Sequence, residues 1–143
     1  MLTVATTGGS GNRSVRAPFP RSARILKPAD FKSVFKKNAS SQDAFFRILA
    51  RPSTAGSARL GMAVSKKVHK SAVVRNRIKR VVRESFRAWR AGLEGVTELP
   101  LDIVVLARPA AARSDNRQLS ESLALHWKRI GPSVDQKFTR KHA

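Results

Sequence analysis

The sequence has 143 residues, with 29 Lys and Arg against 9 Asp and Glu, for a formal net charge of +20. It has the length of one domain with tails, and no apolar run is long enough to span a bilayer. The absence of cysteine excludes disulfides, thiolate zinc sites and cysteine nucleophiles. So large an excess of positive charge favours a polyanionic partner, either a nucleic acid or an anionic membrane surface.

Both ends of the chain differ in composition from its middle. Residues 1–24 are rich in Gly, Ser, Thr, Pro and Arg, contain no acid and show no sustained period. This composition predicts a disordered basic N-terminal extension, with an organellar transit peptide as the alternative. Residues 131–143 are predicted to be a basic C-terminal tail, because Gly131 and Pro132 are residues that end helices.

The first regular element is a helix predicted at residues 28–37. Pro28 suits the first helical position and Asp30 the first turn. Phe31, Val34 and Phe35 recur at helical spacing and form an apolar edge. From this pattern alone, packing in the core is the favoured role of the two phenylalanines.

A strand is predicted at residues 45–50, and its two faces differ. One face holds Phe46, Ile48 and Ala50, and the other holds Phe45, Arg47 and Leu49. The second combination favours two interpretations equally. It is typical of a surface that stacks on and neutralises single-stranded nucleic acid, and also of an edge strand whose arginine extends to solvent.

After a loop at residues 51–59 and a strand at 60–65, a long basic helix is predicted at residues 72–90. Between Lys66 and Arg90 there are ten Lys or Arg residues and one acid, Glu84. With so few acids to form pairs one turn apart, a merely solvated helix face is disfavoured. The apolar positions form one stripe that can pack on a sheet, namely Val74, Ile78, Val81, Val82, Trp89 and Leu93.

The rest of the chain continues the alternation of strands and helices. Residues 91–100 are predicted to be a connection, and residues 101–107 a strand buried on both faces. Asp115 and Gln118 resemble a capping box that opens a last helix. Its inward stripe is Leu119, Leu123, His126, Trp127 and Ile130.

The order helix, strand, strand, helix, strand, helix predicts an α/β (α+β) two-layer sandwich with helices against a small mixed sheet. A strand on either side of a helix implies a crossover and some parallel pairing. One further short strand near residues 38–41 remains an open alternative.

Residues suited to catalysis are scattered along the chain. The nine acids lack the paired spacing of metal-dependent nucleases, and His69, His126 and His142 form no ligand or triad pattern. His126 is predicted to be a packed helix residue, and His69 to contact phosphate or solvent. An autonomous active site, and a metal site built from protein ligands, are therefore not expected.

Three motifs resemble the bacterial ribonuclease P protein family. The first runs from Val64-Ser65-Lys66-Lys67 through Arg75-Asn76-Arg77-Ile78-Lys79-Arg80 to Arg83-Glu84. The second is Asp30-Phe31 with Val34-Phe35, and the third Asp102-Ile103-Val104-Val105 with Ala107-Arg108-Pro109. The similarity covers residues 25–130, which this resemblance identifies as an RNA-binding domain like that of the family.

The resemblance implies a protein subunit of an endoribonuclease whose catalytic centre lies in its RNA. Such a subunit assists Mg²⁺-dependent removal of the 5′ leader from precursor tRNA, the Mg²⁺ being used by the RNA. The fold would contain a left-handed crossover into the basic helix. The residues implied to bind RNA are Lys66, Lys67, Arg75, Asn76, Arg77, Lys79, Arg80, Arg83 and Arg87. The implied leader-binding cleft comprises Phe31, Phe35, Phe45, Arg47 and Leu49.

The expected partners are the catalytic RNA, at one protein per RNA, and precursor tRNA, in the cytoplasm, with neither a membrane nor a small-molecule ligand. Two alternatives from other classes stay open. One is a ribosomal RNA-binding protein or RNA chaperone that serves no enzyme. The other is a DNA-binding protein that uses residues 72–90 as a recognition helix, although strands and loops flank that helix.

Overall fold

The structure, a computed structural model, describes residues 28–53, 58–92 and 100–139. The predicted N-terminal extension at residues 1–24, Leu93 of the predicted stripe and the last four residues of the predicted tail lie outside these ranges. Within them, no helix combines the length and the apolar character needed to cross a membrane.

A four-stranded mixed sheet forms the middle of the domain. Its strands are β2 (Ala39–Gln42), β3 (Phe46–Pro52), β4 (Arg59–Ala63) and β5 (Leu101–Ala107), in the spatial order β2-β3-β5-β4. β3 is antiparallel to both β2 and β5, whereas β4 is parallel to β5. The predicted mixed sheet is confirmed, and β2 is the short strand that the sequence left open.

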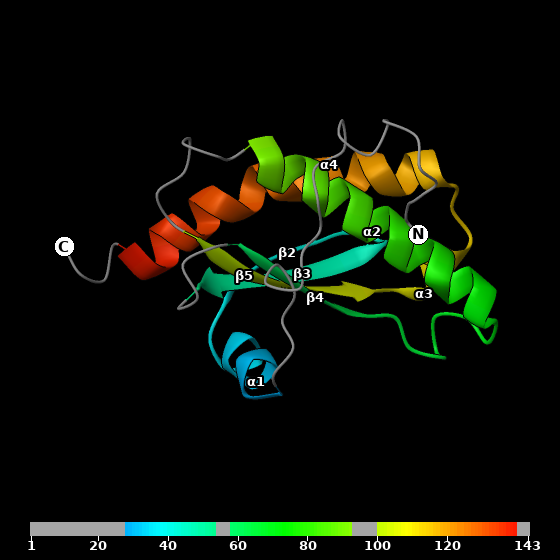
Figure 1. Cartoon of the computed structure of the whole chain (residues 1–143), viewed down its shortest axis with the longest axis horizontal. Helices are drawn as coiled ribbons and strands as arrows, with labels where there is room; N and C mark the ends of the chain where they lie inside the picture. Colours follow the sequence, from blue (N-terminus) through cyan, green and yellow to red (C-terminus); the bar gives the residue numbers. More distant parts are fainter. Residues whose placement is uncertain (1–27, 54–57, 93–99, 140–143) are drawn as a thin grey trace, which may run out of the picture.

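Helices cover both faces of this sheet. α2 (Ala72–Gly92) and α4 (Asn116–Val134) lie side by side on one face, and the short helix α3 (Pro109–Ala112) precedes α4. α1 (Pro28–Lys36) lies on the opposite face (Figure 1). The predicted sandwich of helices on a sheet is confirmed, with α1 added on the far side. α2 joins the parallel strands β4 and β5 and is thus the expected crossover, whose left hand stays a prediction.

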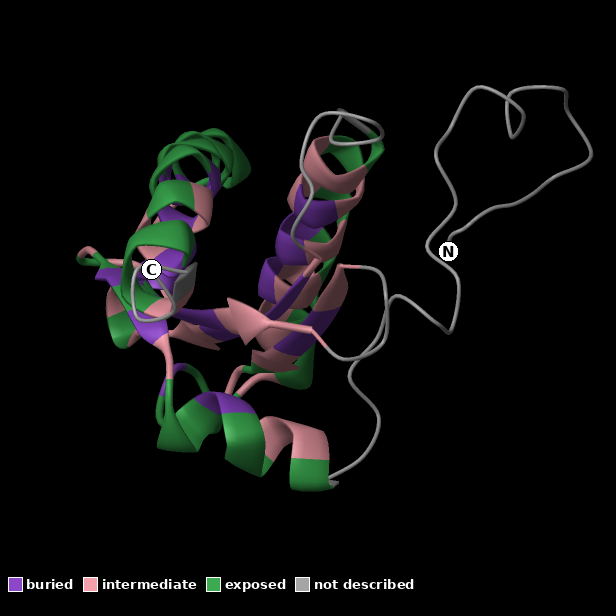
Figure 2. Ribbon diagram, turned by 90° about the vertical axis from the view of Figure 1, so that its left-hand side faces the viewer, coloured by how far each residue is buried: buried purple, intermediate pink, exposed green. Residues whose placement is uncertain are grey.

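The main core lies between the sheet and the pair α2 and α4. Phe46 and Ile48 of β3, Ile78 and Phe86 of α2 and Leu123 of α4 are completely buried. The buried parts of the two helices face the sheet, while their outer sides are exposed (Figure 2). Phe86 falls on the predicted stripe of α2 but was missing from the predicted set.

A smaller cluster fills the space between the sheet and α1. Val34 of α1, Leu49 of β3 and Val104 of β5 are buried, and Phe31 and Leu106 pack against them. Neighbouring residues of β3 therefore point to opposite layers, because side chains alternate along a strand. This confirms the predicted alternation from Phe46 to Ala50 and the burial of β5 on both faces.

The predicted start of α4 is confirmed, but its predicted end is not. The capping box is confirmed: the Gln118 amide donates to Asp115 Oδ1 at 2.8 Å, and the Asp115 amide to Gln118 Oε1 at 3.1 Å. All five residues of the predicted inward stripe are buried. The predicted end at Gly131 and Pro132 is wrong, since α4 continues to Val134 and is followed by a π-helix at Asp135–Thr139.

The reason for this longer helix is packing. Val134 is completely buried and Phe138 packs against the main core. Complete burial of Val134 contributes about 1.5–3 kcal/mol, and the partly buried Phe138 adds to it. Together they offset the roughly 3 kcal/mol that a proline inside a helix costs. Residues 131–139 of the predicted tail are thus part of the folded domain.

A buried polar network connects α4 to the turn between β2 and β3. Ser41 Oγ and His126 Nδ1 lie 2.6 Å apart and share a hydrogen bond, and His126 Nε2 lies 3.1 Å from Asp43 Oδ2. The Ser122 hydroxyl donates to the same Asp43 oxygen at 2.5 Å. His126 is completely buried, which confirms its predicted packing role and adds these polar contacts to it.

Asp43 is the centre of this network, and its ionisation is linked to folding. Burial raises the pKa of Asp43, but hydrogen bonds from Ser122 and from the amides of Phe46 and Phe45, with attraction to His126, outweigh burial. The net pKa lies below its ordinary value of 3.8. A carboxyl group whose pKa is lowered by folding stabilises the folded state above its unfolded pKa, and this stabilisation is lost as pH falls through the folded value.

We predict that Asp43→Asn lowers the free energy of unfolding at about pH 7, and that the difference from the wild type shrinks below about pH 4, as the wild-type carboxylate is protonated. Urea unfolding at a series of pH values measures this difference. Glu121→Gln is the control, because Glu121 is exposed and forms a surface ion pair with Arg117 one turn away. A difference that stays constant down to about pH 2 would contradict the prediction.

Candidate nucleic-acid interface

α2 presents its cations because its apolar stripe is buried. The helix begins after Ser71, whose hydroxyl accepts a hydrogen bond from the Val74 amide at 3.4 Å. Ile78, Val82 and Phe86 then face the core at helical spacing. Since one side of the helix is occupied by these residues, the basic side chains are confined to its flanks and its outer side.

Two predicted RNA-binding arginines hold neighbouring segments. Arg75 Nη1 donates to the carbonyl oxygens of His69 at 2.9 Å and Lys70 at 2.8 Å. Arg77 Nη1 donates to Asn116 Oδ1 at 2.7 Å, and its Nη2 to the Ala112 carbonyl at 3.4 Å. Arg75 therefore fixes the loop before α2, and Arg77 joins α2 to the start of α4.

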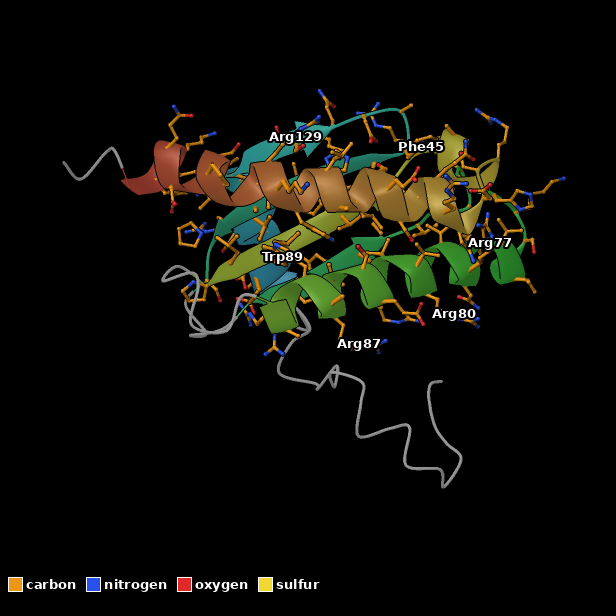
Figure 3. The ribbon with its side chains drawn as sticks, turned by 90° about the horizontal axis from the view of Figure 1, so that it is seen from above. Phe45, Arg77, Arg80, Arg87, Trp89 and Arg129 are labelled. Carbon is orange, nitrogen blue, oxygen red and sulfur yellow. The ribbon has the colours of Figure 1, made fainter. Side chains whose placement is uncertain are left out.

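A second group of predicted residues lacks such contacts. Asn76, Lys79, Arg80 and Arg87 make no hydrogen bond or ion pair with the part of the chain that the structure describes. Arg80 and Arg87 lie along the side of α2 that faces away from α4, whereas Arg77 lies near the start of α4 (Figure 3). The outer side of α2 thus carries cations that are available to an external anion. Asn76 and Arg80 are exposed, whereas Lys79, Arg83 and Arg87 are half-buried.

The loop at residues 64–71 extends the basic surface beyond the start of α2. Lys66, Lys67 and Lys70 are exposed, while Val68 is buried and its amide donates to the Ser65 carbonyl at 3.0 Å. His69 Nδ1 accepts from the Ser71 amide at 3.0 Å, so this exposed imidazole stabilises the turn. The loop is anchored at Val68 and by Arg75, and its lysines point to solvent.

The α1 face of the sheet gathers most of the residues predicted to form a cleft. Phe35 is 50% exposed and Arg47 is exposed, whereas Phe31 is half-buried and Leu49 is buried beneath α1. Phe35 and Arg47 are therefore accessible to a ligand, whereas Leu49 belongs to the buried cluster beneath α1 and is not.

Phe45 does not belong to this group, contrary to the prediction. It precedes β3 and packs against the main core, on the side of α2 and α4 (Figure 3). Asp43 causes this displacement, because its Oδ1 accepts hydrogen bonds from the Phe45 amide at 2.8 Å and the Phe46 amide at 2.9 Å. Because of the resulting bend, the strict alternation begins at Phe46, one residue later than predicted.

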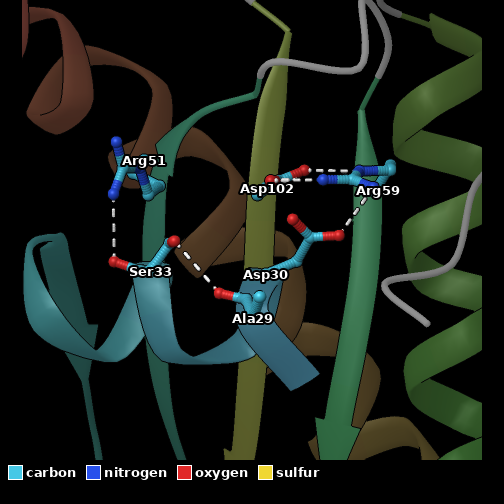
Figure 4. Close-up of polar contacts among 6 residues, drawn as sticks. All are labelled: Ala29, Asp30, Ser33, Arg51, Arg59 and Asp102. Carbon is cyan, nitrogen blue, oxygen red and sulfur yellow. Dashed lines mark hydrogen bonds and ion pairs between the residues drawn. The ribbon is translucent and has the colours of Figure 1, made fainter. Parts of the chain in front are cut away.

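Buried ion pairs that the sequence did not predict hold α1 to the sheet. Arg59 of β4 donates to Asp102 Oδ1 at 2.8 Å and Oδ2 at 2.7 Å, and also to Asp30 Oδ2 of α1 at 3.3 Å (Figure 4). The hydrogen bonds to Asp102 raise the pKa of Arg59 against the opposite effect of burial, and the charges of Asp102 and Asp30 add to the rise. The sequence offered one signal for the contact between Arg59 and Asp102, namely that a basic residue borders one predicted strand and an acidic residue lies in another.

Arg51 provides a second fixed point for α1. Its Nη1 donates to the Ser33 carbonyl at 3.1 Å, and the Ser33 hydroxyl donates to the Ala29 carbonyl at 3.0 Å (Figure 4). Among the described residues there is no group of three His, Asp or Glu side chains placed to hold a metal ion. The candidate site therefore has two parts: the basic outer side of α2, and on the opposite side of the sheet the exposed Phe35 of α1 and the exposed Arg47 of β3.

Comparison with known proteins shows the family of this chain. Residues 19–131 match the family model described as Ribonuclease P. The ribonuclease P protein component of Thioalkalivibrio sulfidiphilus is 45% identical over 112 residues, which cover 78% of this chain and 89% of that protein. The corresponding protein of Methylococcus capsulatus is 43% identical over 109 residues, covering 76% and 81%.

Solved structures give the same result. A mutant RNase P protein from Staphylococcus aureus superposes with a TM-score of 0.67 at 36% identity, covering 76% of this chain and 87% of that one. The RNase P protein from Thermotoga maritima superposes with a TM-score of 0.62 at 35% identity, covering 75% and 96%. Because the family model and these relatives each match most of the chain, it belongs to the bacterial ribonuclease P protein family, the protein component of a tRNA-processing ribonucleoprotein.

Proposed function

We propose that this ribonuclease P protein binds the catalytic RNA through the outer side of α2 and the lysines before it. The observation that supports this most directly is that Lys79, Arg80 and Arg87 of α2 pair with no acid among the described residues. Seven residues separate Arg80 from Arg87, or about 10 Å along the helix, so the two side chains would contact different phosphates. Each such contact releases condensed counterions, which makes binding depend on salt.

The same proposal assigns the 5′ leader of precursor tRNA to the α1 face of the sheet. Phe35 offers a half-exposed ring for stacking or apolar contact with a leader base, and Arg47 a cation for the adjoining phosphate. Arg59 and Arg51 hold α1 in place and leave these two side chains accessible. A leader bound here would be recognised without base-specific hydrogen bonds.

The protein's contribution to the reaction is electrostatic. Mg²⁺, which would be held by the catalytic RNA, would supply the stabilisation of developing charge that phosphodiester hydrolysis requires. The cations of α2 and Arg47 lower the repulsion between leader and catalytic RNA, and so raise substrate affinity at a given Mg²⁺ concentration. We assign one protein to each RNA and place the assembly in the cytoplasm.

We predict that Lys79→Ala combined with Arg80→Ala weakens binding to ribonuclease P RNA while leaving the thermal midpoint of unfolding unchanged. Neither side chain makes a hydrogen bond or ion pair with the described part of the chain, so the loss should fall on RNA contacts. The log-log salt slope should fall by about one for each phosphate contact removed. Filter binding over a range of salt concentrations measures it.

Arg77→Ala is the informative comparison for this experiment. It should weaken RNA binding and also lower the thermal midpoint, because Arg77 donates to Asn116 and to Ala112. If the double variant retained the wild-type salt slope, the outer side of α2 would not be the RNA surface.

We also predict that Phe35→Ala lowers the preference for precursor over mature tRNA by about 5- to 100-fold, as expected from the loss of ~1–3 kcal/mol of base stacking. Half of this side chain is exposed, so the free energy of unfolding should change little. Equilibrium binding of both tRNAs to the reconstituted holoenzyme measures the preference.

Phe45→Ala is the matched control, since this phenylalanine packs against the main core on the other side of the sheet. It should reduce stability without altering the ratio of the two affinities. Equal losses of preference in both variants would assign the effect to misfolding and reject the leader site.

A further inference from the structure

The end of the described chain reaches back to α1 from the opposite side of the sheet. The family match ends at residue 131, so residues 132–139, here termed the C-terminal strap, lie beyond it. Val134 anchors the strap by its complete burial in the main core, and Phe138 packs against the same core. Its position is therefore set by packing.

Lys137 of the strap contacts Asn38, which lies two residues after the end of α1. Its ammonium group donates to the carbonyl oxygen of Asn38. The Asn38 side chain in turn donates to the carbonyls of Val34 at 2.7 Å and Phe35 at 3.4 Å. Asn38 thus satisfies two carbonyl groups at the C-terminal end of α1, and Lys137 fixes the backbone of Asn38.

A second contact joins the same two segments. The Lys37 ammonium lies 5.4 Å from the centroid of the Phe138 ring, within the range of a cation–π interaction. Two neighbouring residues after α1, Lys37 and Asn38, are therefore held by two neighbouring residues of the strap.

These contacts complete the attachment of α1. Asp30 in its first turn is paired with Arg59, and Ser33 in its middle accepts from Arg51. The last turn carries Phe35, which is half exposed and gives little packing energy to hold it. Without the strap, the packing of Val34 on Leu49 and Val104 would be the main contact that holds this turn to the sheet.

We propose that Lys137 and Phe138 are positioning residues that hold the last turn of α1, and with it Phe35, in place for binding the 5′ leader. This proposal rests on the leader site proposed above. The strap acts on the geometry of the site and does not touch the leader itself, so its removal should alter the leader preference more than RNA affinity.

Hydrogen exchange on the full-length protein tests the positional claim independently of any RNA. The Lys37 amide, which donates to the Ser33 carbonyl at 3.2 Å, reports opening of the last turn of α1. In Lys137→Ala and Phe138→Leu it should exchange about 3- to 10-fold faster, as expected from losing one cation–π or hydrogen-bond contact. Amides of α2 should be unaffected.

Asp115→Ala serves as the control for loss of stability. It removes the capping box at the start of α4, at the other end of that helix from the strap. The ratio of the exchange rate of the Lys37 amide to the exchange rates of the α2 amides should therefore stay as in the wild type. Unchanged exchange at Lys37 in both strap variants would overturn the proposal.

The functional arm uses the reconstituted holoenzyme with precursor and mature tRNA. Lys137→Ala should lower the leader preference about 3-fold while affinity for the catalytic RNA is retained, and Lys137→Arg should restore the preference, because it keeps a donor at this position. A normal preference in Lys137→Ala would reject the positioning role. If the wild type itself showed no preference, the leader site would be rejected, while hydrogen exchange would still decide whether the strap holds α1.

Discussion

The burial of the apolar side of α2 stabilises this helix against the mutual repulsion of its many basic side chains. Ile78, Val82 and Phe86 are fully or almost fully buried, and each such side chain contributes about 1.5–3 kcal/mol. A like-charge pair one turn apart on a helix surface costs only about 0.2–0.5 kcal/mol. A few buried side chains therefore outweigh many repulsive pairs, and the helix can carry cations such as Arg80, which pairs with no acid in the part of the chain that the structure describes.

Two strands make this arrangement possible, because β3 and β5 are buried on both faces. Ile48 faces α2 and α4 while Leu49 faces α1, and Ile103 and Val104 of β5 divide in the same way. A shift of one residue in β3 would exchange the two sets. The sheet thus keeps the basic face of α2 and the accessible aromatic of α1 in separate layers, and fixes the orientation of each relative to the other.

Features that depend on residues close together in the chain could be predicted from the sequence, because the local spacing of residue types determines them. The capping box at Asp115, the stripe of α4 and the apolar run of β5 are of this kind, and all three are confirmed. Contacts between distant segments were not readable. The bend that moves Phe45 depends on the Asp43 network, the pairing of Arg59 depends on strand register, and the extension of α4 past Pro132 depends on where Val134 packs. The resemblance to a family carried the functional assignments that local patterns left open.

The arginines of this protein differ in whether their hydrogen-bond acceptors are charged carboxylates or neutral oxygens. Arg59 meets two carboxylates, which neutralise it, and it serves the structure alone. Arg75 and Arg77 also hold segments together, but their acceptors are carbonyl and amide oxygens, which carry no net charge. Both therefore retain their full positive charge in the field at the protein surface. A residue that bonds to neutral acceptors can stabilise the fold and still attract RNA, which is why internal hydrogen bonds do not remove Arg75 and Arg77 from the proposed interface.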